Sequence, residues 1–160
     1  MFQIGDKVSY PMHGAGIIEA IEEKLILDVA RKYYCLRFAD GVMKVLIPVE
    51  TAMNIGLRSI IGPAHAQQVL ELIFSGECPE DNSNWNKRLR ENQDKLKSGD
   101  IFEVARVVKG LKFRMCEKGL SSGEKRMMNQ SMQILVSELS LSLEQDPISL
   151  KEQIIKTKIS

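Results

Sequence analysis

The stretch GPAHAQQVLELIF, residues 62–74, decides the fold class of this 160-residue chain, because the spacing of apolar residues changes there. The apolar side chains within it recur at helical intervals: Val69, Leu70, Ile73 and Phe74. A Gly-Pro pair can open this helix and Gly76 can end it. The chain before this stretch has the spacing of strands, and the chain after it has the spacing of helices.

Four segments before residue 50 are short, rich in Val, Ile, Tyr and Phe, and separated by turn residues. They are KVSYP (7–11), GIIEAIEEKLIL (16–27), RKYYCLRF (31–38) and MKVLIP (43–48). We expect turns at Asp28 to Ala30 and at Asp40-Gly41. Four or five strands in fifty residues predict a small antiparallel barrel or a strongly bent sheet, whose open edge is a natural docking surface.

Capping residues predict the helices that follow residue 76. Ser83 or Asn84 can cap a helix that begins near Trp85, Asp100 can cap the next, and Ser121 with Glu124 forms a capping box for a third. After Pro147 we expect a last short helix from Ser149, with Glu152 completing a second capping box and Ile154 and Ile155 facing the bundle. The predicted fold class is therefore α+β, with a β module at residues 1–58 and an all-α helical bundle at residues 59–160.

Composition and motifs exclude several classes of protein. The chain has no run of 18 uncharged apolar residues and no signal-peptide pattern, so we expect a cytoplasmic protein that does not enter a membrane. Its three cysteines, Cys35, Cys78 and Cys116, are too widely spaced for a metal site or a disulfide framework and are expected to be free thiols. HGAGII, residues 13–18, lacks the spacing of a phosphate-binding loop.

No catalytic motif is present, so we expect neither an enzyme nor a bound cofactor or metal. An enzymatic alternative would need a pocket built from scattered groups such as His13, Cys35 and Glu50.

Charge is segregated along the chain, although the net charge is only +1. Residues 82–126 hold 12 Lys and Arg against 6 Asp and Glu, which leaves 10 against 15 elsewhere. This asymmetry favours an acidic or polyanionic partner for one region only, while a solvated helix face is the plainer interpretation of a basic stretch.

Trp85, the only tryptophan, stands at the start of the basic segment SNWNKRLREN, residues 83–92. The ring could simply anchor the helical core. Its position at a first helical turn, where backbone N–H groups attract phosphates, instead suits a residue inserted at a DNA base step. Its indole N–H could also meet acceptors in the minor groove.

Six segments taken together resemble the CarD/CdnL family of bacterial transcription regulators, in order and over nearly the whole chain. They are GDKVSYPMHGAGIIEAIEEK, MKVLIPVE, GLR, NWNKR, SGDIFEVARVVKGL and GLSSGEKRM. The first three also resemble the polymerase-interaction domain of the transcription-repair coupling factor. The resemblance implies a Tudor-like, or SH3-like, β module that docks on the RNA polymerase β subunit, and a helical module that meets promoter DNA.

The resemblance also implies roles for individual residues. The family's minor-groove tryptophan matches Trp85, and family residues that contact or face the DNA backbone match Lys87, Arg90 and Lys125. Arg88 and Arg114 match further basic family positions, and we expect them to face DNA as well. Two polymerase-binding positions that often carry arginine match Lys24, which keeps the charge, and Leu46, which loses it. We expect a monomer that stabilises the promoter open complex at the upstream edge of the −10 region, with ribosomal RNA promoters among its targets. The alternative from the residues alone is a non-specific binder of single-stranded DNA or RNA.

Overall fold

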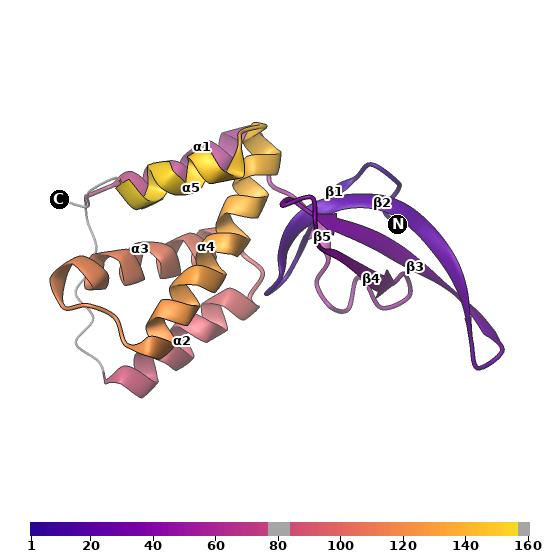
Figure 1. The fold of residues 1–160 in the computed structure, drawn as a ribbon, viewed down its shortest axis with the longest axis horizontal. Helices are drawn as coiled ribbons and strands as arrows, with labels where there is room; N and C mark the ends of the chain where they lie inside the picture. Colours follow the sequence, from indigo (N-terminus) through magenta and orange to yellow (C-terminus); the bar gives the residue numbers. More distant parts are fainter. Residues whose placement is uncertain (77–83, 157–160) are drawn as a thin grey trace.

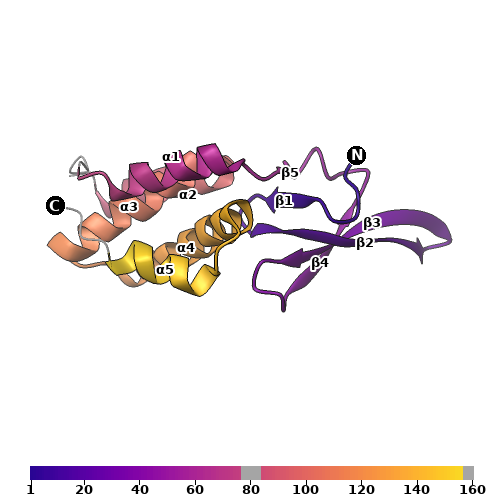
Figure 2. The same ribbon diagram turned by 90° about the horizontal axis from the view of Figure 1, so that it is seen from above.

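The computed structural model describes residues 1–76 and 84–156, and shows a sheet and a group of helices side by side (Figures 1 and 2). The five strands are β1 (Lys7–Tyr10), β2 (Gly14–Ile26), β3 (Val29–Phe38), β4 (Lys44–Pro48) and β5 (Arg58–Ser59). They form one antiparallel sheet in the order β4-β3-β2-β1-β5. The predicted α+β class is therefore confirmed, and β5 is a strand that the sequence pattern did not indicate.

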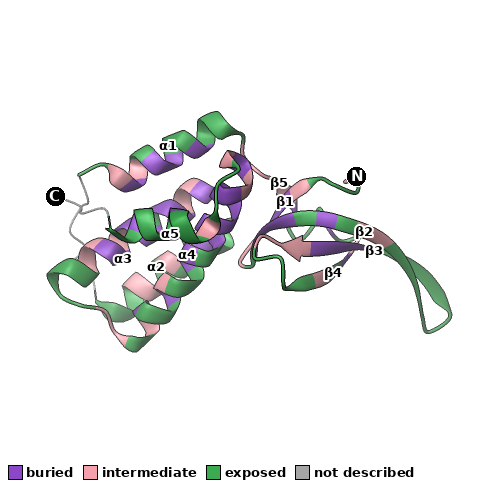
Figure 3. Cartoon of the chain, turned by 45° about the horizontal axis from the view of Figure 1, so that its top comes forward, coloured by how far each residue is buried: buried purple, intermediate pink, exposed green. Residues whose placement is uncertain are grey.

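The longest strands, β2 and β3, form a hairpin that extends well away from the helices (Figure 1). Their pairing ends with Ile26 opposite Val29, so Leu27 and Asp28 make the turn, earlier than the turn expected at residues 28–30. Both turn residues have positive φ, 52° and 62°, as a tight two-residue hairpin turn requires. The hairpin end is exposed to solvent (Figure 3).

The helices are α1 (Pro63–Phe74), α2 (Trp85–Lys97), α3 (Ile101–Glu117), α4 (Ser122–Leu143) and α5 (Pro147–Lys156). Three predicted caps are present: Asn84 Oδ1 accepts from Lys87 N, Asp100 caps α3, and Ser121 with Glu124 forms the capping box of α4. Ser83, the other cap considered for α2, lies outside the described residues, as does Cys78. The longest helix, α4, contacts the other four helices and β2, so it forms the centre of the molecule.

The prediction for the last helix is wrong in two respects. It begins at Pro147, and the carboxylate of Asp146 accepts hydrogen bonds from the Ser149 backbone and hydroxyl, so Ser149 lies within the first turn instead of capping it. Ile154 is fully buried, whereas Ile155 is about half exposed. Proline is well suited to a first helical turn because it has no N–H to leave unpaired there.

Two separate groups of buried side chains make up the interior. The core of the sheet is built on Val8, Ile18, Tyr34, Leu36 and Ile47. The larger helical core includes Leu96, Val108, Leu135 and Leu139, with Leu89 and Met128 packed partly against it. Each module therefore has its own core, and polar contacts between α4 and the β module join them.

Candidate nucleic-acid and polymerase interfaces

Trp85 lies at the end of the helical module that is distant from the sheet. The other end of α2 reaches the β module, because the backbone oxygen of Gly99 accepts hydrogen bonds from Arg58. Thirteen helical residues span about 20 Å. The first turn of α2 is therefore held away from the sheet, at the lower left of Figure 1.

The indole ring of Trp85 is half exposed, at 45% of its accessible surface, and is fixed by the start of α4. Its Nε1–H donates to Ser121 Oγ at 2.8 Å. A Cβ built on Gly123 would lie 3.6 Å from Cζ2 of the ring, so the ring packs directly over this glycine. The sequence-based expectation that the N–H bonds a minor-groove acceptor therefore does not fit this geometry, since the donor is already used. The ring can offer an apolar edge and face.

The buried carboxylate of Glu124 connects the elements that meet beside Trp85. Its side chain is 3% exposed, and its Oε2 lies 3.6 Å from Arg88 Nε and 3.4 Å from Arg114 Nε. Its other oxygen accepts from the backbone N–H and the hydroxyl of Ser121. One carboxylate thus connects α2, α3 and the cap of α4. Arg88 and Arg114, both expected to face DNA, lie against this carboxylate, and their side chains are 11% and 24% exposed.

The other expected DNA-facing cations, Lys87, Arg90 and Lys125, are exposed around the ring. Lys87 Nζ lies 3.8 Å from Glu91, a solvent-exposed pair, while Arg90 and Lys125 form no ion pair with any residue in 1–76 or 84–156. The first turns of α2 and α4 meet at Trp85, so two helix N-termini add partial positive charge to the same corner. This corner can hold phosphates on either side of an apolar ring.

Lys24 and Leu46, the expected polymerase-binding positions, lie on one face of the sheet. Lys24 is opposite Arg31 in the β2–β3 pairing, and Leu46 is opposite Cys35 in the β3–β4 pairing. Arg31 and Cys35 are four residues apart on β3, so all four side chains point to the same side. Leu46 is 38% exposed and Lys24 is exposed, so both are accessible to a partner.

A partly buried ion pair joins the two modules. Arg58 of β5 donates from Nη1 and Nη2 to the two oxygens of Glu138 on α4, at 2.7 and 2.9 Å, and the Glu138 side chain is 1% exposed. Glu138 also accepts from the backbone N–H of Ile61 at 2.9 Å. Because Arg58 also donates to Gly99 O, its guanidinium joins β5 to α4 and to the turn before α3, while Glu138 holds the segment after β5 through the Ile61 N–H.

Ser137 provides a second contact at this joint. Its Oγ accepts from the Ala15 backbone N–H at 2.8 Å and donates to Ile134 O. A Cβ on Gly14 would lie 2.8 Å from that oxygen, and Gly14 has φ +110°, so only glycine fits. Sequence reasoning missed this joint because its partners are far apart in the chain and form no local motif.

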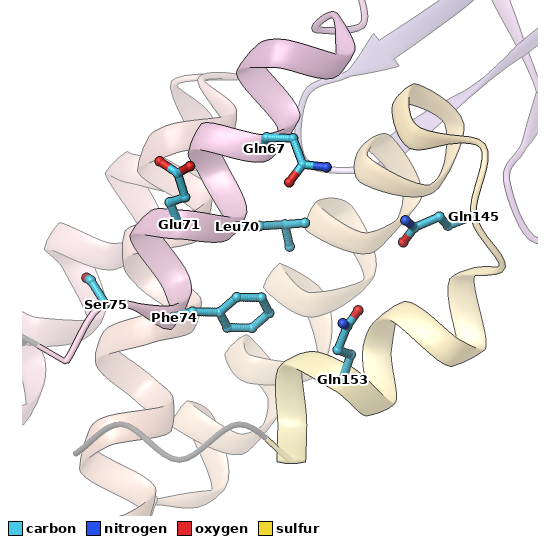
Figure 4. A pocket seen from close by; sticks show the side chains of 7 residues that line it. All are labelled: Gln67, Leu70, Glu71, Phe74, Ser75, Gln145 and Gln153. Carbon is cyan, nitrogen blue, oxygen red and sulfur yellow. The ribbon is translucent and has the colours of Figure 1, made fainter.

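The groove between α1 and α5 has an open volume of about 500 Å³ and is lined by seven residues (Figure 4). Leu70 and Phe74 form its apolar side, with Gln67, Gln145 and Gln153 around it. Ser75 donates to Leu72 O at 2.9 Å and accepts from Lys109 Nζ, so its hydroxyl completes the end of α1 and is not a free nucleophile.

Across residues 1–76 and 84–156, no helix is both long and apolar enough to cross a membrane.

Each of the two modules matches the model of a known protein family. Residues 2–61 match the family model described as CarD-like/TRCF RID domain, and residues 68–155 match the one described as CarD, C-terminal domain. Over 141 residues the chain is 39% identical to a Bacillus subtilis (strain 168) protein named "Putative transcription factor YdeB". The aligned residues make up 88% of this chain and 92% of that protein. The two matches follow one another in the order of the two modules, and the chain belongs to the CarD family of transcription regulators.

Proposed function

We propose that this chain docks on the RNA polymerase β subunit through its β module and stabilises the promoter open complex by inserting Trp85 into the minor groove at the upstream edge of the −10 region. The match of residues 2–61 to a TRCF RID domain supports interaction with polymerase. The observation that carries the DNA contact is the half-exposed ring of Trp85, held at the meeting point of two helix N-termini.

The fixed ring suits insertion because little freedom is lost on binding. The bond to Ser121 and the contact over Gly123 hold one orientation before DNA arrives. Unstacking a base step costs a few kcal/mol, and this cost is least where the duplex is already opening. The exposed cations Lys87, Arg90 and Lys125 would then bind the phosphates beside the opened step.

Docking on polymerase supplies the specificity. A module held at one promoter position acts at high effective concentration, so a weak and sequence-tolerant DNA contact is sufficient. A ring that binds the opened duplex about 1.4 kcal/mol better than the closed one changes the opening equilibrium tenfold. Promoters with short-lived open complexes, including those of ribosomal RNA, would respond most strongly.

The lifetime of the open complex tests this proposal. With Trp85→Ala, we expect polymerase binding to be unchanged and the lifetime to fall to that of polymerase alone. Trp85→Phe keeps a ring but loses the donor to Ser121, so it should retain an intermediate lifetime. Equal lifetimes with Trp85→Ala and with the unchanged chain would refute the insertion.

A chain that binds single-stranded oligonucleotides without polymerase would instead be a non-specific nucleic-acid binder. Quenching of Trp85 fluorescence by free oligonucleotides measures this directly, since the chain has one tryptophan. We expect no saturable quenching at physiological salt, because the DNA-facing corner has few exposed cations. Co-precipitation with the β subunit, lost with Leu46→Asp, would support the docked regulator.

A further inference from the structure

A cleft lies where the turns of the sheet meet α4 and α5. Its open volume is about 680 Å³, which is within the range of sites that bind small molecules, and such sites often lie between domains. The turns at His13 and Asp40 line it on the side of the sheet, and the middle of α4 and the start of α5 line it on the other side. The cleft shares no described residue with the corner at Trp85 or with the face that carries Lys24 and Leu46.

The base of the cleft is an apolar strip. Met132 and Val136 are one helical turn apart on α4 and are only 3% and 6% exposed. Phe38, the last residue of β3, adds an aromatic ring to the same lining. Asn129 and Gln133 stand on the same face of α4, are exposed, and form no hydrogen bond within the described ranges. The strip can therefore hold an aliphatic ligand and offer amides to its polar groups.

Two aspartates line the cleft, one from each module. Asp40 Oδ1 accepts from the backbone N–H groups of Val42 and Met43, at 2.9 and 3.1 Å. Asp146 Oδ2 accepts from the backbone N–H and the hydroxyl of Ser149, at 3.0 and 3.1 Å. The other oxygen of each carboxylate bonds no residue in 1–76 or 84–156, and neither aspartate pairs with a cation there. Both carboxylates are thus held in place without being neutralised.

His13 and Lys151 complete the charge balance of the lining. Partial burial lowers the pKa of the His13 imidazole from its ordinary value, so the ring is neutral at pH 7. Lys151 is exposed and forms no ion pair with another described residue. Two carboxylates against one ammonium leave the lining negative, which favours a cation as the ligand.

We propose that this cleft binds a linear aliphatic polyamine, whose ammonium groups bond Asp40 and Asp146 and whose methylene groups lie on the apolar strip of α4. Ammonium and carboxylate form charge-assisted hydrogen bonds, and burial of the methylene groups adds a hydrophobic contribution. The ring of Phe38 offers a further contact to an ammonium group. Because the two aspartates belong to different modules, the ligand joins the modules at a second place besides the pair of Arg58 and Glu138.

Calorimetric titration of the full chain with spermidine at physiological salt, without polymerase or DNA, tests this proposal. We expect saturable binding at one site. Asp40→Asn and Asp146→Asn keep an oxygen for the backbone hydrogen bonds and remove the charge, so both variants should fold. Each should weaken spermidine binding by at least about fivefold. Asp94→Asn is the control, because it makes the same change in charge on an exposed turn of α2 and should weaken binding by less than about twofold.

The charge of Lys151 and the number of ammonium groups supply a second readout. Lys151→Gln removes a cation from the lining, so spermidine should bind at least about twofold more tightly. Butylamine carries one ammonium group and can reach only one of the two carboxylates. It should bind the unchanged chain at least about tenfold more weakly than spermidine does.

The outcomes that overturn the inference are specific. Absence of saturable spermidine binding would overturn it, as would equal weakening by Asp40→Asn and Asp94→Asn, which would mean that the cation is attracted only by overall charge. Weaker binding by Lys151→Gln would also overturn it, because the lysine would then be a ligand for an anion. Docking on polymerase and insertion of Trp85 are measured separately and do not depend on these results.

Discussion

Helix α4 and the end of the β2–β3 hairpin differ in whether their charged side chains have partners of opposite charge. On α4, two glutamates are almost fully buried, and each has arginine partners from another element: Glu124 meets Arg88 and Arg114, and Glu138 meets Arg58. At the hairpin end, Lys24 and Arg31 are opposed and have no acidic partner in the described chain. Exposed apolar residues lie beside them.

The buried glutamates of α4 hold the elements of the molecule together, whereas the exposed cations of the hairpin are accessible to other molecules. The glutamates of α4 are fourteen residues apart, about 21 Å along the helix, and fix its two ends. One end holds Trp85 through Ser121, and the other holds the β module through Arg58. A contact made on the sheet can therefore place the ring at a defined position, whereas Lys24 and Arg31 at the hairpin end have no counter-charge among the described residues.

Loss of the joint should have the largest effect. Glu138→Ala removes the acceptor of two Arg58 hydrogen bonds and of the Ile61 N–H. We expect a loss of about 3 kcal/mol in the free energy of unfolding, because buried donors are left without partners. Urea unfolding measures the loss. Glu144→Ala is the control, since that carboxylate is exposed and 3.9 Å from Lys7, and it should change stability by less than about 0.5 kcal/mol.

Equal urea midpoints for these two variants would contradict the role of the joint. Small-angle scattering should also show a more variable separation of the modules for Glu138→Ala.

Removing the charge at the other end of α4 should have a smaller effect. Glu124→Gln keeps an acceptor for the capping box but takes away the charge that faces Arg88 and Arg114. We expect a loss of about 1 to 2 kcal/mol, and a red shift of Trp85 emission as the ring loosens. Glu152→Gln, on an exposed turn of α5 next to Lys156, should change neither quantity. Unchanged Trp85 emission from Glu124→Gln would show that Glu124 does not hold the ring in place.

The hairpin end should become more stable when its turn is changed. Leu27 has φ +52° and is 93% exposed, so its side chain contributes strain without packing. Leu27→Asn suits that conformation and should raise the free energy of unfolding by about 0.5 to 1 kcal/mol. Leu25→Asn, on the adjoining strand, should bring no gain. Thermal unfolding of both variants checks this, and a destabilised Leu27→Asn would mean that the turn is already optimal.

The sequence predicted the helices and caps, which depend on residues close together in the chain. It did not predict the side-chain bonds between residues that are far apart in the chain. Hydrophobic spacing and caps such as Asn84, Asp100 and Ser121 predicted the helices, since each cap acts within one turn. The bonds of Arg58 to Glu138 and of Trp85 to Ser121 span 80 and 36 residues and leave no periodic pattern.

The hairpin shows a second limit. Expecting the turn at residues 28–30 instead of Leu27-Asp28 shifts the register, so Lys24 would not have been placed opposite Arg31. Ser149 failed as a cap because Asp146 precedes it and accepts the hydrogen bonds itself.

In the proposed mechanism, the ring of Trp85 at the N-terminal end of α2 enters a base step that is opening. A fluorescent base at the upstream edge of the −10 region reports on this step. In a polymerase–promoter complex, 2-aminopurine placed at that step brightens when its stacking is lost. We expect the unchanged chain to raise its fluorescence and Trp85→Ala to leave it at the level of polymerase alone while remaining bound. An equal rise with Trp85→Ala would mean that the ring does not enter the opened step.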